Sequence, residues 1–64
     1  MNYLLEALIK KLEGEVAMAK ANIKVYEVNP AGIGEHPDVV QAIETQIEVI
    51  ANAEEKIETI RKHF

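Results

Sequence analysis

The sequence predicts an all-α protein: an antiparallel two-helix hairpin, with helices at about 2–28 and 37–63, that dimerises into a four-helix bundle. Two observations favour this fold. In each half of the chain, apolar residues recur at alternating spacings of three and four, which places them on one face of an α-helix. A segment holding both prolines separates the halves. We call these positions the seam: Leu5, Ile9, Leu12, Val16, Ala19, Ile23, Tyr26, Val39, Ile43, Gln46, Ile50, Ala53, Ile57 and Ile60.

The first helix has clear start and stop signals. Asn2 is a favourable N-cap residue, and Glu6 lies in the early turns, where the helix dipole favours an acid. Asn29 precedes Pro30, and a residue before proline is pushed out of the α-helical region, so the helix ends there. Gly14 costs the helix about 1 kcal/mol relative to alanine, and it falls on the face opposite the seam.

The second helix is expected to begin at Pro37, a residue type that suits the first helical position, with Asp38 in the first turn. The loop at 29–36 is longer than the roughly two to five residues that an antiparallel helix pair needs. Both helices and the loop form a single helical-hairpin domain at 1–64.

The two halves of the seam come into register when the chain folds back about residue 33. The facing pairs are then Ile23 and Ile43, Val16 and Ile50, Ile9 and Ile57, Tyr26 and Val39, Ala19 and Gln46, Leu12 and Ala53, and Leu5 and Ile60. Leu12 opposite Ala53 matches a large residue with a small one. Ala19 opposite Gln46 leaves a thin, partly polar layer that a second hairpin could fill.

Size and composition favour self-association. A chain of 64 residues buries a modest share of its surface, and the absence of cysteine rules out a disulfide staple. Further apolar residues flank the seam, as in the helices of a bundle; they are Leu4, Leu8, Met18, Val25, Val40, Ile47 and Val49. We therefore expect a homodimer, or a higher even-numbered assembly. Gln46 is then either a polar residue that sets the register or a rim residue with its amide in water.

Charge and hydropathy restrict the partners. The net charge is −4 and the charges are spread along both helices, whereas a nucleic-acid surface requires a basic stripe. Nucleic acid is therefore not an expected partner. No apolar run approaches the length of a membrane span, and no secretory signal is visible, so we expect no membrane association and a cytoplasmic location.

The loop is the first candidate site. Gly32, Ile33, Gly34, Glu35 and His36 form the segment with residues to spare, and loops on rigid scaffolds often carry function. Its simplest interpretation is a structural turn in which Ile33 caps the bundle end. Backbone N–H groups around the glycines could instead hold an anion, although the nearby acids would oppose it. A metal site at Glu35, His36 and Asp38 is disfavoured, because the ligands lack the spacing of known sites.

No catalytic arrangement is present in the sequence. The chain has no serine and no cysteine, and its few hydroxyl groups have no convergent base. The Glu-x-x-His spacing of di-metal helical bundles is also missing. We therefore expect a non-enzymatic protein without a cofactor or a metal.

Two resemblances add to this interpretation. In architecture alone, the chain resembles the Rop-type plasmid RNA-binding hairpin, which dimerises into a four-helix bundle. The segments Asn29–Asp38 and Ala53–Phe64 resemble short, uncharacterised proteins of tailed bacteriophages, including phages of marine cyanobacteria. The second resemblance implies a small phage accessory protein made in a bacterial cytoplasm. That family offers no activity or site residues to carry over.

Two functions from different classes remain. The first is a self-associating adaptor that binds a protein partner through the loop or through leftover apolar surface, for which Tyr3, Met18, Val25 and Val28 are candidates unless they serve ordinary packing. The second is an oligomer that sequesters a nucleotide-like ligand on Lys20, Asn22, Lys24 and Tyr26, unless these are a solvated face with a core tyrosine.

Overall fold

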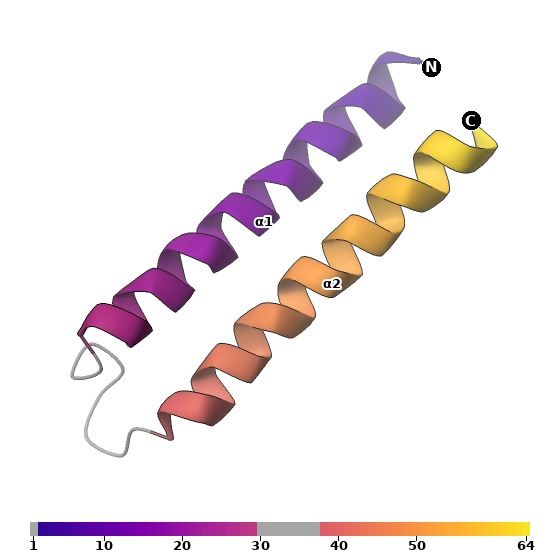
Figure 1. The fold of residues 1–64 in the computed structure, drawn as a ribbon. Helices are drawn as coiled ribbons and strands as arrows, with labels where there is room; N and C mark the ends of the chain where they lie inside the picture. Colours follow the sequence, from indigo (N-terminus) through magenta and orange to yellow (C-terminus); the bar gives the residue numbers. More distant parts are fainter. Residues whose placement is uncertain (1, 30–37) are drawn as a thin grey trace.

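The computed structural model describes residues 2–29 and 38–64. Two α-helices make up this part of the chain: α1, Tyr3–Val28, and α2, Val39–His63. They lie side by side and run in opposite directions, so that α1 begins at the end of the hairpin where α2 finishes (Figure 1). The predicted antiparallel hairpin is confirmed, whereas the dimer stays a prediction.

The ends of α1 follow the expected signals. The Asn2 side-chain oxygen accepts a hydrogen bond from the Leu5 backbone N–H at 2.9 Å, and Glu6 lies in the first turn. At the other end, the Asn29 backbone N–H donates to the Val25 carbonyl at 2.7 Å. Side-chain capping satisfies a backbone donor that would otherwise lack a partner within the helix.

The start of α2 differs from the expectation by two residues. The helix begins at Val39, and Asp38 is its N-cap rather than a first-turn residue. The Asp38 carboxylate accepts a hydrogen bond from the Gln41 backbone N–H at 2.9 Å, which is why the helix starts after it. The predicted first-position residue Pro37 and most of the predicted loop, 30–36, lie outside the described residues.

Replacing the N-cap Asp38 with Ala should destabilise the hairpin. Loss of the bond to Gln41 costs about 1 kcal/mol, which lowers the melting temperature of a domain of this size by about 4–8 °C. Asp38→Asn keeps an acceptor oxygen and should melt near the wild type. Circular dichroism melts at one protein concentration test this, and an Asn variant as unstable as the Ala variant would contradict the capping role.

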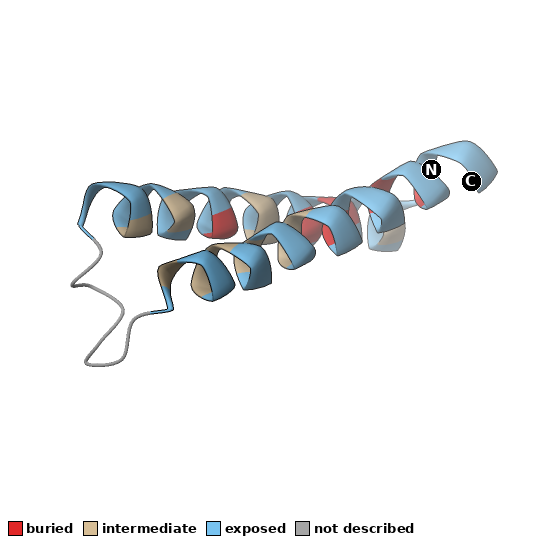
Figure 2. Cartoon of the chain, turned by 60° about the horizontal axis from the view of Figure 1, so that its bottom comes forward, coloured by how far each residue is buried: buried red, intermediate tan, exposed pale blue. Residues whose placement is uncertain are grey.

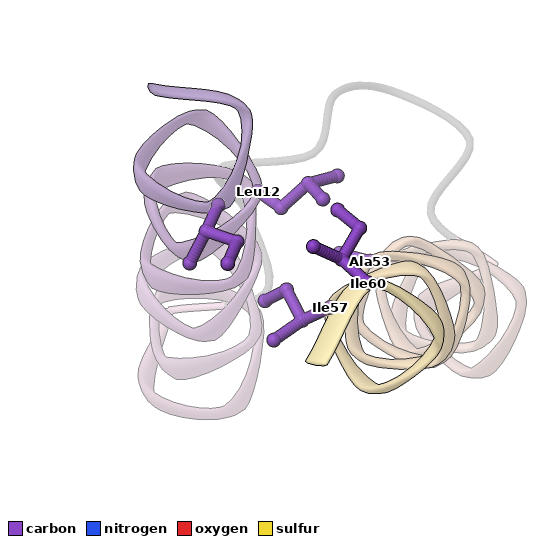
Figure 3. Packing of buried hydrophobic residues seen from close by; sticks show 5 residues of the cluster. Leu12, Ala53, Ile57 and Ile60 are labelled. Atoms are coloured by element: carbon purple, nitrogen blue, oxygen red, sulfur yellow. The ribbon is translucent and has the colours of Figure 1, made fainter. Parts of the chain in front are cut away.

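The core lies between the two helices. The buried side chains of the described residues are all apolar, namely Ile9, Leu12 and Ala19 on α1 and Ala53, Ile57 and Ile60 on α2. Figure 3 shows Leu12 of α1 and Ala53, Ile57 and Ile60 of α2 pointing into the space between the helices. Every seam residue is buried or half-buried, and these lie on the facing sides of the helices (Figure 2). The seam is therefore the interface between the two helices of a single chain.

The core is tightest in the half of the hairpin that holds the start of α1 and the end of α2. Ile9, Leu12, Ala53, Ile57 and Ile60 form one cluster there, with Leu5 and Val16 packed against it. Towards the other end, the remaining seam residues except Ala19 are only half-buried. One stripe of contacts between two helices thus encloses a small core.

Two polar contacts cross between the helices. The Asn22 side-chain amide of α1 donates to the Gln46 side-chain oxygen of α2 at 3.2 Å, and Arg61 lies 3.9 Å from Glu13. Gln46 therefore bonds to Asn22, one turn from its predicted neighbour Ala19. Ala19 itself is 1% exposed, so the layer expected to be thin is already closed within one chain.

Neither α1 nor α2 contains a stretch long and apolar enough to cross a lipid bilayer.

Candidate interaction surface

Exposed apolar side chains concentrate on α1. Nine large apolar side chains of the described residues are exposed, and six of them belong to α1: Tyr3, Leu4, Leu8, Met18, Val25 and Val28. The other three are Val40, Ile47 and Phe64. Single exposed apolar residues are ordinary, but several along one helix mark a candidate interaction surface.

A second heptad pattern runs along the outer side of α1. Its members recur at alternating spacings of three and four, as the seam residues do, and all of them are exposed. We call this set the back stripe: Leu4, Ala7, Lys11, Gly14, Met18, Ala21, Val25 and Val28. Heptad geometry places it on the side of α1 that faces away from the seam, and therefore away from α2. Helix α1 thus has two apolar sides, and the hairpin covers one of them.

From the sequence, Met18 and Val25 were named both as residues flanking the seam and, with Val28, as candidate partner surface, and Gly14 was placed opposite the seam. Ala7 and Ala21, which join these residues into one stripe, were missed. The sequence does contain a pattern that could have identified the stripe, because Ala7, Gly14 and Ala21 recur every seven positions between the larger residues. A helix with apolar residues on opposite sides is typical of one packed against more than one neighbour.

Gly14 has no role in packing within the chain. A Cβ atom built on this residue would meet no atom within 4 Å. Glycine in a helix interior costs about 1 kcal/mol relative to alanine, and nothing inside the hairpin requires it. Near its midpoint, the side of α1 opposite α2 therefore has no side chain at Gly14 and is open to solvent.

One charged pair lies next to Gly14. The Lys11 ammonium lies 3.6 Å from the Glu15 carboxylate, four residues further along the helix. That Glu15 oxygen is buried and has no hydrogen-bond partner within the described residues. The Lys11 side chain, which belongs to the back stripe, is 71% exposed.

The hairpin also has two open grooves along its edges. The larger, of about 550 Å³, carries three carboxylates and one guanidinium and is lined by Glu13, Val16, Glu54, Ile57, Glu58 and Arg61. The smaller, of about 350 Å³, is lined by Leu8, Asn52, Glu55, Lys56, Thr59 and Ile60. The ion pairs Lys10–Glu13 and Glu13–Arg61 lie along the first groove at 3.7 and 3.9 Å. These exposed pairs stabilise the fold little.

The predicted ligand patch is not gathered on one face. Lys20 and Lys24 are four residues apart and share a side of α1, whereas Asn22 is two residues from each and projects elsewhere. The Asn22 amide is bonded to Gln46, and Tyr26 is a half-buried seam residue. The four side chains therefore do not converge on a common ligand position.

The loop candidates Gly32, Ile33, Gly34, Glu35 and His36 lie outside the described residues, and so do the predicted turn, anion and metal roles of this segment. Within 2–29 and 38–64, no three histidine, aspartate or glutamate side chains gather closely enough to hold a metal ion.

The geometry leaves the back stripe of α1 as the candidate surface with the most exposed apolar side chains. Comparisons with models of protein families, with curated proteins and with solved structures found no match for this chain.

Proposed function

We propose that the protein is a non-enzymatic, self-associating helical module in which two hairpins form a four-helix assembly that serves as an adaptor for a protein partner. The observation that carries the proposal is the contrast between the two sides of α1. One side closes a small core against α2, while the other exposes the back stripe, whose members other than Lys11 are apolar residues and glycine.

The size of the core supports self-association. A two-helix hairpin of this length buries one stripe per helix, which is marginal in water without a disulfide, a metal or a partner chain. The chain has no cysteine. Covering the exposed side of α1 would add apolar burial, at roughly 25 cal/mol for each Å² removed from water.

The dimensions of the hairpin suit such an interface. Its principal extents are 45 × 15 × 15 Å. A stable protein interface buries roughly 800 Å² per partner, which is comparable with one long face of a molecule of these dimensions. A second hairpin placed along α1 would therefore cover an area of the required size.

Adaptor activity would follow from the remaining surface. A dimer presents each exposed feature twice, and Val40 and Ile47 of α2 lie off the back stripe, where they stay open to a further protein. The resemblance to small proteins of tailed phages supplies a setting, phage assembly or host takeover. The alternative of a nucleotide-like ligand draws no support from Lys20, Asn22, Lys24 and Tyr26, because they do not share a face.

The test is the solution mass of the protein as a function of concentration, measured by sedimentation equilibrium with helicity recorded in parallel. We expect twice the chain mass at low micromolar concentration and a melting temperature that rises with concentration, because association stabilises the folded state by mass action. A fully helical monomer throughout this range would overturn the proposal.

A further inference from the structure

We infer that two copies dock through their back stripes with the α1 helices antiparallel, on a two-fold axis that passes beside Gly14. This inference rests on the proposed self-association and specifies its interface. Because the back stripe faces away from α2, the four helices would form a row with the two α1 helices in the middle, in place of the four-helix bundle predicted from the sequence. Two-fold contacts are self-complementary: if residue i touches residue j of the second copy, then j touches i of the second copy. The back stripe has this property about its middle.

The order of residues along the stripe shows the match. With Gly14 facing Gly14 of a second, antiparallel copy, Ala7 faces Ala21, Leu4 faces Val25, and Lys11 faces Met18. Small residues thus meet small ones, and large residues meet large ones. Gly14 is also close to the midpoint of α1, Tyr3–Val28, so the two helices overlap along almost their whole length of about 39 Å.

The small residues of the back stripe allow the two α1 helices to pack closely. Ala7, Gly14 and Ala21 fall on one line along the helix, which allows the two backbones to come close together. At Gly14 the hairpin itself leaves open space. The helix-propensity cost of glycine is offset when a second backbone packs against that position, where a side chain would keep the helices apart.

Charge distinguishes the antiparallel from the parallel arrangement. In a parallel pair, Lys11 would face Lys11 of the second copy. In the antiparallel pair, the Lys11 stem packs on Met18, and Lys24 comes beside Tyr3, a favourable cation–aromatic pair.

A second copy of this chain is therefore the occupant that the stripe fits. A helix of an unrelated protein would have no reason to follow the symmetry of the stripe about Gly14. In such a case the purified chain would remain a monomer, which is one of the outcomes of the experiment below.

The first arm of the experiment compares Gly14→Leu with Ala51→Leu by sedimentation equilibrium. Leucine at 14 fits the hairpin, because the space is open and leucine is a better helix former than glycine. At the two-fold axis it holds the helices apart, and we expect self-association to weaken about 10- to 100-fold. Ala51 is exposed on α2 and lies off the stripe, so the same added side chain should leave the dimer intact. Circular dichroism checks that both variants remain helical.

The second arm measures orientation by pulsed electron paramagnetic resonance. The chain has no native cysteine, so Lys20→Cys and Glu27→Cys can each carry one nitroxide label. These residues are exposed, lie off the back stripe and share one edge of α1 seven positions apart. In the antiparallel pair the axial separation between copies is about 17 Å at 20 and about 38 Å at 27. In a parallel pair the two distances would be equal.

The outcomes separate the two proposals. A dimeric wild type, a weakened Gly14→Leu variant and a longer distance at 27 than at 20 support the inference. A Gly14→Leu variant as dimeric as the wild type, or equal label distances, overturns the docking geometry while self-association stands. A monomeric wild type overturns both.

Discussion

Replacing Leu12 with Asp is expected to unfold the protein. Leu12 is 2% exposed and is the largest fully buried side chain of the described residues. It belongs to the cluster with Ile9, Ala53, Ile57 and Ile60. Truncating a buried leucine alone costs about 2–5 kcal/mol, and a carboxylate in this position has no cationic partner in the cluster. The loss approaches or exceeds the whole stability of a small domain. Far-ultraviolet circular dichroism should show a largely unfolded chain at ambient temperature.

The matched control is Val40→Asp. Val40 is 79% exposed and lies in the first turn of α2, where the helix dipole favours a negative charge. The same new carboxylate should therefore leave helicity and melting temperature close to those of the wild type. If Leu12→Asp kept native helicity and melted with the control, the cluster between α1 and α2 would not hold the hairpin together.

The seam was predictable because its signal is distributed over many positions. All of its residues follow the same heptad spacing, so a single polar member such as Gln46 does not obscure the pattern. Burial of Ile9, Leu12, Ala53 and Ile57 then follows from packing two such stripes against each other. The N-cap role of Asn2 was equally accessible, since it depends on a local preference for that residue type.

Features that depend on one side chain were harder to predict. At the start of α2, Pro37 and Asp38 are both residue types that favour a helix start, so the sequence did not decide which residue precedes the helix. In the structure Asp38 is the N-cap, because its carboxylate accepts a hydrogen bond from the Gln41 backbone N–H. The bond between Gln46 and Asn22 depends on side-chain reach across the interface, which heptad numbering does not specify. Helix ends and polar pairings are therefore less certain than the period itself.

The back stripe was predicted only in part, since its larger members were named but not its heptad pattern. The seam is rich in isoleucine and leucine, whereas the back stripe includes alanine, glycine and one lysine, so its mean hydropathy is lower. Once the structure assigns the seam to the contact with α2, the remaining apolar residues of α1 require an explanation of their own. Gly14 is informative because its position costs helix stability and serves no contact within the chain.

Replacing Met18 with Lys should largely abolish self-association, whereas replacing it with Glu should preserve it. Met18 is 64% exposed in the hairpin, and in the antiparallel pair it faces Lys11 of the second copy. Lysine at 18 therefore sets two like charges against each other at two symmetry-related places. Since such contacts cost several kcal/mol in an interface, we expect dimerisation to weaken about 100-fold or more. Glutamate at 18 would instead meet an opposite charge.

Within one chain, the effect of these two substitutions on helix stability is opposite to their expected effect on dimerisation. Glu15 precedes position 18 by three residues, so lysine there gains a few tenths of a kcal/mol and glutamate loses a similar amount. A weaker dimer for the lysine variant therefore cannot come from a weaker helix. Sedimentation equilibrium at low and high salt measures the difference, and salt should reduce it by screening the partly exposed charges. If both variants dissociated equally, position 18 would not face Lys11, and the antiparallel alignment about Gly14 would be wrong.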